Sequence, residues 1–435
     1  MRRLFLLLAT LLFSQLSVYA KESIVISSAR ELSKLSAVKA GAEIVWRNGE
    51  YADEILVISA SGTAQKPIIL RAESDGGVRF TGTSSLRIKG SNIIVRGFVW
   101  DNPMLEKGIV VSFDRSSSHS LLEECVIKGN RSEMRPANNI KWVSVWGYKN
   151  RVERCSFVDK RDLGQILIVR LAKDEKAPQH IVRNCYFTRP NSLLNEKGGR
   201  INGQCCIRFG TSDVAQQQAE CVVENCYFEH CNGEGEIISS KSCGNIFRNN
   251  LFYECRGSLT LRHGNNSQVL DNYFIGNGEP LTAGIRVIGE GHTIKGNYLR
   301  GLRAGSSRRH HCAIHLLQGQ ENAPAGGYQQ VKNVVVSKNI VVDCLYGISA
   351  NSQRGGCDLP VLSTVVEGNT IVADDDNCTV ASEDAPHEIV WRDNTIFGGK
   401  QLGLSLGEED KKPTLPNVKA ALNAIRKGAG AAFLK

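Results

Sequence analysis

Unusual polar residues are concentrated between positions 202 and 292. Glu234 and Glu236 are two positions apart, so on a β-strand their side chains would lie on the same face. Two neighbouring carboxylates repel each other unless a cation lies between them, and oxygen ligands of this kind suit Ca²⁺. The pair therefore predicts a calcium site, although most such pairs in proteins are solvated surface charges.

Two cations follow the carboxylate pair. Lys241 ends a short serine-rich segment, and Arg262 follows it after about one repeat of the chain, directly before His263. Residues one repeat apart can stack on one face of a repeat protein, so Lys241 and Arg262 could act together. Considered alone, each would more often be a solvated charge, and His263 could equally be a histidine of the core.

The elements that must position these residues are short repeats. An apolar residue, a polar residue and an asparagine, followed by apolar or aromatic residues, recur from residues 182–187 to residues 391–396. The asparagines Asn225, Asn250, Asn272 and Asn297 are 25, 22 and 25 residues apart. A period near 25 with short β-branched strands is one coil of a parallel β-helix. The sequence predicts an all-β protein, a right-handed single-stranded parallel β-helix.

The repeat also assigns tasks to asparagine and cysteine. Each tight corner needs a left-handed residue, which asparagine tolerates, and identical asparagines in successive coils can form a hydrogen-bonded ladder. Four of the 14 cysteines occupy one place in the repeat: Cys125, Cys155, Cys185 and Cys226. We expect these to be stacked, buried thiols, because free cysteine is among the most buried residue types. No Cys-x-x-Cys occurs, which leaves zinc and redox sites without support.

The two ends of the chain differ from the repeats. Residues 1–20 carry a basic start, an apolar run and a small residue at position 20, which predicts a cleaved signal peptide and export to the periplasm or the medium. Residues 21–410 are expected to form the β-helix, and residues 411–435 a tail with a short helix. Ser28 and Glu31 form a capping box, which predicts a short N-terminal capping helix through about Val38. Both helices are expected to cap the ends, and the irregular loops are expected at 103–119, 188–206 and 302–330.

The composition of the chain limits the classes of partner that the protein is expected to bind. The formal net charge is +9, from 53 basic and 44 acidic residues, but no basic run of the kind that binds nucleic acid occurs. No later segment is apolar enough to span a membrane. An anionic polysaccharide is the partner that fits an exported basic protein. The sequence does not predict the oligomeric state.

Three motifs carry a resemblance to a known family. Residues 234–242, Arg262-His263-Gly264 and residues 284–287 resemble polysaccharide lyase family 6, which holds alginate lyases and the dermatan-cleaving chondroitinase B. Residues 48–51 and 66–68 extend the resemblance over most of the chain. It implies a parallel β-helix that cleaves a uronate polymer by β-elimination.

The resemblance implies roles for individual residues. The family's calcium ligands are an asparagine and two glutamates, which match Asn202, Glu234 and Glu236. Its catalytic base matches Lys241, and its acid matches Arg262. Three further residues lie where substrate contacts are expected: Arg208, His263 and Arg286. Relatives often read Asn-Gly-x-Glu where this chain has Asn202-Gly203-Gln204-Cys205, so a carboxylate is missing here and Gln204 is an alternative ligand to Asn202.

β-Elimination is a reaction that residues of these types can catalyse. β-Elimination removes the weakly acidic proton at C5 of a uronate, and Ca²⁺ on the substrate carboxylate would stabilise the enolate-like intermediate. A lysine base must be a neutral amine, a form that burial and a nearby cation favour. Because a guanidinium rarely releases its proton, Arg262 is interpreted as mainly an electrostatic stabiliser.

Other functions stay open at this point. Alginate is the first choice of substrate, and dermatan or chondroitin sulfate is the alternative. A non-catalytic polysaccharide-binding β-helix would need neither Lys241 nor Arg262. A polygalacturonase-type hydrolase or a uronan epimerase on the same fold is a further alternative. A hydrolase needs paired carboxylates that flank the bond, and the only acidic cluster of that kind in the sequence is residues 374–376. Endo and exo action are not distinguished.

Overall fold

The computed structural model describes residues 23–35, 38–130, 134–303, 312–352, 355–374, 376–382 and 388–435. The predicted signal peptide, residues 1–20, lies outside these ranges, so cleavage and export stay predictions. In the part of the chain that the structure describes, no helix is both long and apolar enough to cross a membrane.

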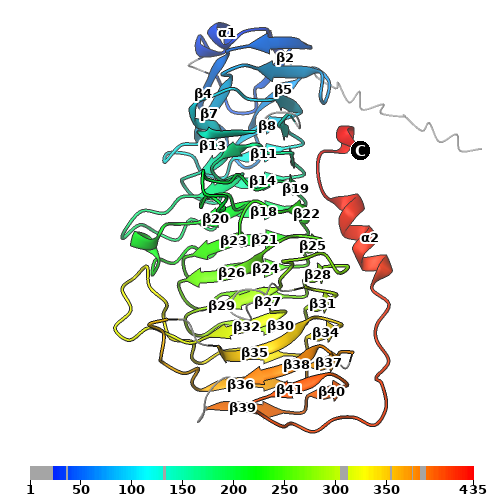
Figure 1. Ribbon diagram of the computed structural model, residues 1–435. Coiled ribbons are helices and arrows are strands. Elements are labelled where there is room, and N and C mark those ends of the chain that lie inside the picture. The colour runs from blue at the N-terminus through cyan, green and yellow to red at the C-terminus, as the bar shows by residue number, and fades with distance from the viewer. Residues whose placement is uncertain are drawn as a thin grey trace, which may run out of the picture.

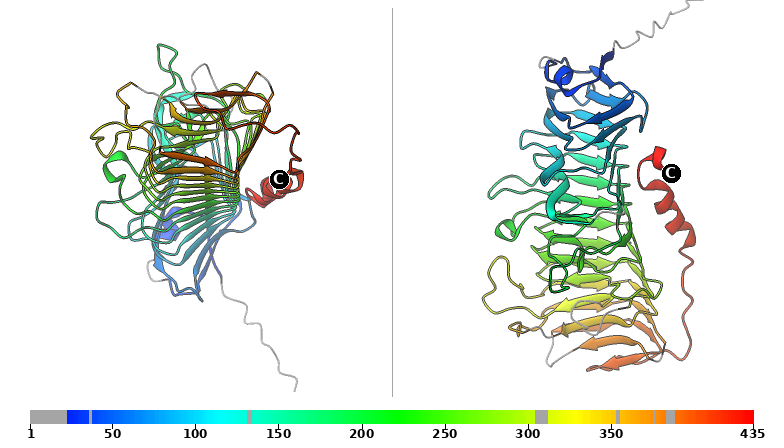
Figure 2. Two further views of the ribbon diagram at one scale, coloured as in Figure 1. Left: turned by 90° about the horizontal axis from the view of Figure 1, so that it is seen from below. Right: turned by 45° about the horizontal axis from the view of Figure 1, so that its top comes forward.

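Three long parallel sheets make up the molecule, and a typical coil contributes one strand to each sheet (Figures 1 and 2). In one coil, β24 (Ile246–Arg248) is followed by β25 (Leu251–Tyr253) and β26 (Ser258–His263). The strands of the next coil pair with these in parallel, without a change of sheet. The predicted all-β parallel β-helix is confirmed.

Sheet A holds the first strand of each coil. Its 14 strands are β1 (Ser23–Ile26), β2 (Glu43–Trp46), β5 (Ile68–Ala72), β8 (Ile93–Arg96), β11 (Leu121–Glu123), β14 (Arg151–Glu153), β18 (Ile181–Arg183), β21 (Val222–Glu224), β24, β27 (Gln268–Leu270), β30 (Thr293–Lys295), β33 (Val335–Ser337), β36 (Thr364–Glu367) and β39 (Ile389–Arg392). Sheet B has 13 strands: β3 (Gly49–Ala52), β6 (Val78–Thr81), β9 (Phe98–Asp101), β12 (Val126–Lys128), β15 (Ser156–Val158), β19 (Tyr186–Arg189), β22 (Tyr227–Cys231), β25, β28 (Tyr273–Ile275), β31 (Tyr298–Arg300), β34 (Ile340–Val342), β37 (Thr370–Val372) and β40 (Thr395–Phe397).

Sheet C holds the third strand of each coil and carries the site described below. Its 14 strands are β4 (Ile55–Ser61), β7 (Ser85–Ser91), β10 (Lys107–Phe113), β13 (Arg135–Val145), β16 (Asp162–Leu163), β17 (Leu167–Val169), β20 (Ile207–Phe209), β23 (Glu236–Lys241), β26, β29 (Ile285–Val287), β32 (Ile314–Leu317), β35 (Tyr346–Ser352), β38 (Cys378–Ser382) and β41 (Lys400–Leu402). Strand β10 lies in the segment 103–119 and β32 lies in the segment 302–330, both of which we expected to be loops, so those predictions are wrong for these residues. Strand β10 continues the ladder between β7 and β13 because its apolar residues Val110, Val111 and Phe113 are buried in the core.

The predicted asparagine ladder is present. However, the residue that forms the ladder and the residue that takes the left-handed conformation at the corner are two adjacent residues. Asn250 Nδ2 donates to Asn272 Oδ1 at 2.9 Å, and Asn272 Nδ2 donates to Asn297 Oδ1 at 3.0 Å. The ladder continues through Asn339, Asn369 and Asn394. The left-handed residue of each corner comes one position earlier, as at Asn249 (φ 53°) and Asp271 (φ 54°). One residue turns the chain, and the next satisfies buried backbone groups.

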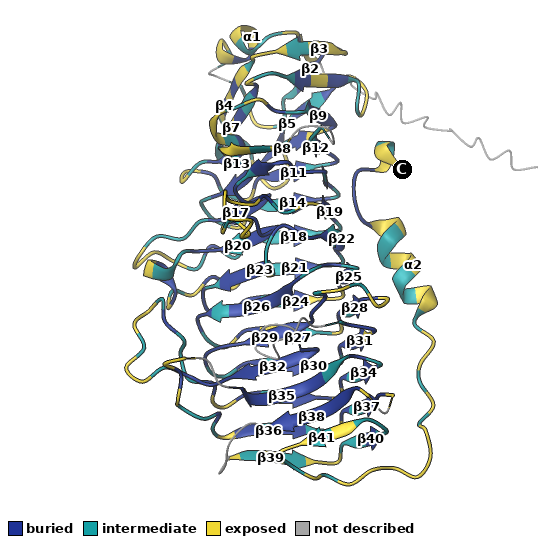
Figure 3. Cartoon of the chain, in the orientation of Figure 1, coloured by how far each residue is buried: buried dark blue, intermediate teal, exposed yellow. Residues whose placement is uncertain are grey.

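Cysteines take the ladder position in the earlier coils. Cys125, Cys155, Cys185 and Cys226 are buried free thiols, as predicted. The amide of Cys226 donates to Asn250 Oδ1 at 3.0 Å, so the thiol stack leads directly into the asparagine ladder. Inside the helix, stacked phenylalanine rings of sheet B, from Phe157 to Phe274, lie 4.5 to 5.1 Å apart between centroids. Figure 3 shows that most residues of the strands are buried along the length of the β-helix.

The N-terminal helix α1 (Ala29–Ser33) lies at the first coil (Figure 1). Ser28 Oγ accepts the amide hydrogen of Glu31 at 3.3 Å, and the Glu31 carboxylate accepts that of Ser27 at 2.6 Å. The predicted capping box is therefore present, with its return bond one residue earlier than usual. The helix ends at Ser33, before the predicted end near Val38.

The C-terminal helix α2 (Lys419–Gly428) does not cap the last coil. The tail runs back along the outside of the β-helix and sets α2 against sheet B (Figures 1 and 2). Leu422 and Ile425 cover Tyr227 and Leu251 there, and the amide of Ala431 donates to Ser156 Oγ at 2.9 Å. The helix lies on this flank because sheet B presents apolar and tyrosine side chains outward. A 3₁₀ turn, η2 (Ala432–Leu434), follows it, and another, η1 (Ser212–Val214), follows β20.

Candidate active site

Parallel register on sheet C brings residues from distant parts of the chain into one row. Arg208 of β20 pairs with Ser239 of β23, Ser239 pairs with Thr260 of β26, and Thr260 pairs with Arg286 of β29. Strands of a sheet are about 4.8 Å apart, so this row places one residue per coil along one strip of sheet C. The strip is the floor of the site.

Lys241 lies opposite His263, not opposite Arg262. The register of β23 and β26 shifts after Ser240, so that Arg262 is the additional residue of β26. The predicted direct stacking of Lys241 on Arg262 is therefore wrong by one position, because a bulge re-aims the extra side chain. Both side chains nevertheless belong to the same strip, and Lys241 is partly exposed.

The carboxylates lie beside these cations. Glu236 is the first residue of β23, whereas Glu234 lies in the turn before it. Glu236 Oε1 is 3.3 Å from Arg286 Nη2 and 3.9 Å from Arg262 Nε. The Arg286 side chain is only 8% exposed, so its charge is compensated mainly inside the protein. Glu236 thus joins the two arginines into one charged cluster.

Glu234 is held in a less favourable electrostatic environment. Its Oε2 atom accepts the amide hydrogen of Gly203 at 2.8 Å. Burial raises the pKa of Glu234 above its ordinary value, the bond from Gly203 opposes this, and the Glu236 carboxylate raises the pKa again. A cation between the two carboxylates would relieve both unfavourable effects.

The two candidate amide ligands, Asn202 and Gln204, differ in their exposure and in their hydrogen bonds. Asn202 is exposed, and its Oδ1 atom accepts the amide hydrogen of Gly203, the same group that bonds Glu234. Gln204 is buried; its Nε2 atom donates to Leu193 O and Ile201 O, and its Oε1 atom accepts from Leu193 N. Gln204 therefore has no group left for a metal, and Asn202 is the better candidate.

These residues fit a hard cation. Asn202, Glu234 and Glu236 offer only oxygen atoms, which is the donor set that Ca²⁺ prefers. Among the described residues, no group of three or more His, Cys, Asp and Glu side chains could hold a metal ion. A calcium site on this strip would therefore need the Asn202 amide as its third protein ligand.

His263 is a buried, neutral histidine. Its Nδ1 atom lies 3.2 Å from Arg262 Nη1, and its Nε2 atom lies 3.4 Å from Ser212 Oγ. Because a guanidinium can only donate, Nδ1 must accept and Nε2 must carry the proton. Burial, with Arg262 and Lys241 nearby, lowers the pKa of His263 to about 3. The imidazole thus orients Arg262 without adding charge.

Sequence reasoning missed the residues that hold Arg262 from the other side. Arg262 Nη1 donates to Gly327 O at 3.2 Å, and its guanidinium lies 4.3 Å from the centroid of the Tyr328 ring. Both residues belong to the loop after β32, far from Arg262 in the sequence. Their only sequence feature is a single tyrosine that follows a glycine- and alanine-rich segment, which does not indicate a site by itself.

A row of cations extends the strip toward the N-terminal coils. Burial lowers the pKa of Lys141, and the neighbouring Arg170 and Arg208 lower it further. Burial, and then Arg208, likewise lower the pKa of Arg170. No carboxylate among the described residues forms an ion pair with these three side chains. An uncompensated row of this kind favours an anionic ligand.

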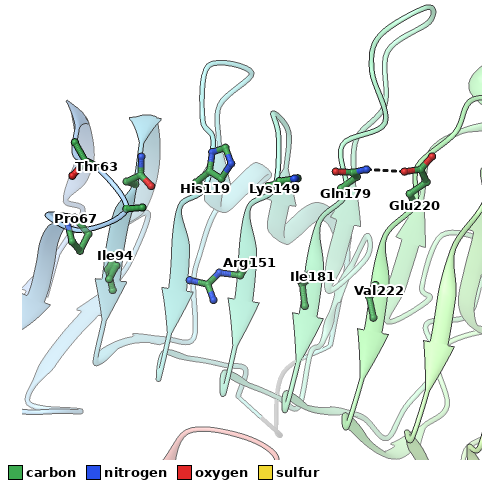
Figure 4. A pocket seen from close by; sticks show the side chains of 12 residues that line it. Thr63, Pro67, Ile94, His119, Lys149, Arg151, Gln179, Ile181, Glu220 and Val222 are labelled. Carbon is green, nitrogen blue, oxygen red and sulfur yellow. Dashed lines mark hydrogen bonds between the residues drawn. The ribbon is translucent and has the colours of Figure 1, made fainter.

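Two other features lie away from the strip. A groove of about 620 Å³ lies on the outer face of sheet A, where Gln179 Nε2 donates to Glu220 Oε2 at 2.7 Å (Figure 4). It contains none of the predicted site residues. The acidic cluster 374–376 follows β37 of sheet B, and its described members, Asp374 and Asp376, are exposed.

Comparisons with known proteins agree with this geometry. The sequence model of the family described as Chondroitinase B matches residues 26–411. The alginate lyase AlyGC of polysaccharide lyase family 6 is 31% identical, with a TM-score of 0.83 over 95% of this chain and 57% of its own. The chain therefore spans little more than half of AlyGC. Compared with curated protein sequences, the chain has no match.

Two further solved structures share the fold at lower identity. A mannuronic acid-specific family 6 lyase from human gut microbiota is 23% identical, with a TM-score of 0.76 over 94% of this chain and 96% of its own. The family 6 lyase Pedsa3628 from Pseudopedobacter saltans is 23% identical, with a TM-score of 0.72 over 94% and 99%. The family match over nearly the whole chain and the 31% identity to AlyGC carry the assignment: the chain belongs to polysaccharide lyase family 6, the family of chondroitinase B.

Proposed function

We propose that this protein cleaves an acidic uronate polymer, alginate in the first place, by Ca²⁺-assisted β-elimination that leaves unsaturated ends. The observation that carries the proposal is the grouping of Lys241, Arg262 and the two glutamates on one strip of sheet C. A lyase needs a base, a stabilising cation and a means to neutralise the substrate carboxylate, and the strip offers each of these.

Each residue has a distinct task in this proposal. Lys241 Nζ takes the C5 proton, the C4–C5 double bond forms as the bond from C4 to the glycosidic oxygen breaks, and water gives that oxygen its proton. Arg262, held by His263, Gly327 and Tyr328, stabilises the negative charge that develops at the sugar. Because Arg262 is partly buried and Arg286 lies nearby, the pKa of Arg262 is lowered from the ordinary arginine value, but the group stays a cation.

A calcium ion would be held by Asn202, Glu234 and Glu236. When bound, it would supply a positive charge that neutralises the substrate carboxylate and so acidifies the C5 proton. The all-oxygen donor set and the raised pKa of Glu234 support this assignment.

Alginate is the proposed substrate because AlyGC, the relative with 31% identity, is an alginate lyase. The row of Lys141, Arg170 and Arg208 supports a polyanion that lies along the strip, with one cation per coil facing its carboxylates. Dermatan sulfate is the second candidate, since the matching family model is that of chondroitinase B.

Export is proposed from residues 1–20, whose composition is that of a cleaved signal peptide. An enzyme for external polymers must leave the cytoplasm, so export and polysaccharide cleavage support each other. N-terminal sequencing of the protein from the periplasm and the medium tests this point. A start at residue 1 would contradict it.

The substrate assignment is tested with a panel of polymers. The purified protein is incubated with alginate, dermatan sulfate and polygalacturonate, each with Ca²⁺, and the ultraviolet absorbance of unsaturated uronate is followed. We expect an increase on alginate. If the absorbance increased with dermatan sulfate alone, dermatan sulfate would replace alginate as the proposed substrate. New reducing ends without an increase in absorbance would indicate a hydrolase.

A further inference from the structure

Arg189, the last residue of β19, is a fully buried cation beside the proposed calcium ligands. Its Nη1 atom donates to Gly164 O at 2.8 Å and to Gln204 O at 3.0 Å. Its Nη2 atom donates to Asp162 O at 2.6 Å and to Gln204 Oε1 at 3.3 Å. Among described residues, no carboxylate lies within ion-pair distance, so the charge is solvated by carbonyl oxygens alone.

A buried guanidinium without a carboxylate is costly, and most cores avoid it. The four bonds from the two Nη atoms to fixed acceptors offset this cost in part, because the buried Nε atom has no partner among the described residues. The planar fork of arginine suits this task, because it binds several oxygens in one rigid arrangement. Arg189 therefore fixes whatever segments supply those oxygens.

The segments that Arg189 joins are those that carry the calcium ligand candidates. Gln204, which gives two of its acceptors, follows Asn202 by two residues. On the other side, Gly233 lies directly against Arg189 and precedes Glu234. A Cβ atom at position 233 would lie 2.4 Å from Gln204 O and 2.8 Å from Arg189 Cδ, so only glycine fits.

We propose that Arg189 is a positioning residue for the cation site: it fixes the segment 202–204 against the turn 233–236, so that Asn202, Glu234 and Glu236 converge on one divalent cation. This inference rests on the proposed calcium-assisted function. Arg189 contacts neither the substrate nor the metal. The bond from Gly203 N to Glu234 Oε2 is the direct link between the two segments, and Arg189 sets the distance that this bond spans.

Calcium binding by the purified full chain tests the proposal without reference to activity. Calorimetric titration with CaCl₂ is applied to the wild type, Arg189→Met and Arg189→Lys. Groups that orient metal ligands typically contribute about tenfold to a hundredfold to affinity. We expect Arg189→Met to weaken calcium binding by at least about tenfold, and Arg189→Lys to weaken it less than Arg189→Met does. The calcium concentration for half-maximal lyase activity should shift by the same factor, with little change in kcat at saturating calcium.

Two further variants separate positioning from general loss of stability. Val366→Ala removes core volume in β36, many coils away, and should lower the unfolding temperature without changing calcium affinity. Gly233→Ala disturbs the same contact from the other side and should weaken binding as Arg189→Met does, which keeps the test valid if Arg189→Met does not fold. If folded Arg189→Met or Gly233→Ala bound calcium with wild-type affinity, the inference about Arg189 would be overturned, and the proposed calcium site would stand. A wild type that binds no calcium would overturn the proposed calcium site, and the inference with it.

Discussion

Replacing Lys241 by methionine should separate catalysis from stability. The substitution removes the amine and keeps most of the apolar stem. In the part of the chain that the structure describes, no ion pair or side-chain hydrogen bond involves Lys241, and its side chain is partly exposed. The free energy of unfolding should therefore change by no more than about 0.5 kcal/mol.

The effect on the rate should be far larger. A positioned general base contributes about 10² to 10⁴ to a rate, which corresponds to about 3 to 5 kcal/mol of barrier. We expect Lys241→Met to lower the initial rate of unsaturated uronate formation from alginate by at least about a hundredfold. The assay is run at saturating Ca²⁺, and the urea midpoint of the same sample is measured.

Lys295→Met is the matched control, since Lys295 is an exposed lysine at the end of β30 on sheet A. It should leave both the rate and the urea midpoint unchanged. If Lys241→Met kept more than about a tenth of the wild-type rate, far above the loss expected of a general base, Lys241 would not be the base. A large fall in the urea midpoint would instead show that the lysine supports the fold.

Three other predictions follow from the same structure. Asn272→Ala leaves the backbone and side-chain donors of Asn250 without their acceptor, so the free energy of unfolding should fall by about 2 to 4 kcal/mol; an unchanged urea midpoint would contradict the ladder. Burial lowers the pKa of His292 to about 4, so the unfolded chain takes up a proton below about pH 6.5 that the folded chain refuses. Stability should therefore fall with decreasing pH from about 6.5 to 4, by about 1.4 kcal/mol per pH unit for this residue, and thermal unfolding of His292→Asn should show a smaller slope. Tyr328→Leu removes the ring under Arg262 and should lower kcat/KM about fivefold in initial-rate measurements; an unchanged kcat/KM would contradict a role for the ring.

The coil architecture could be predicted from the sequence because it is local and repeated. Each copy of the repeat places its corner, its ladder residue and its inward apolar residues within a few positions, so one copy supports the next. Even so, the exact division between the left-handed Asn249 and the ladder residue Asn250 depended on dihedral angles that a sequence pattern does not contain. The same holds for the bulge that places Lys241 opposite His263.

The less predictable features all depend on contacts between distant segments. Tyr328 reaches Arg262 from a loop two coils further on, and no periodicity relates them. Helix α2 was expected from its composition, but its position on sheet B depends on which face of the β-helix offers apolar side chains. The sequence names Asn202 as the amide ligand and Gln204 as its alternative, and the burial of Gln204 and its hydrogen bonds with Leu193 and Ile201 decide between them.

Calcium-dependent formation of unsaturated uronate from alginate is the measurement that tests the central claim most directly. The purified protein is incubated with alginate after treatment with a chelator, and Ca²⁺ is then added back in excess. We predict no absorbance increase without the metal and a full return of the increase with it. Unsaturated product at an undiminished rate in the chelated sample would contradict the calcium site, and no unsaturated product from alginate or dermatan sulfate under either condition would contradict the lyase assignment itself.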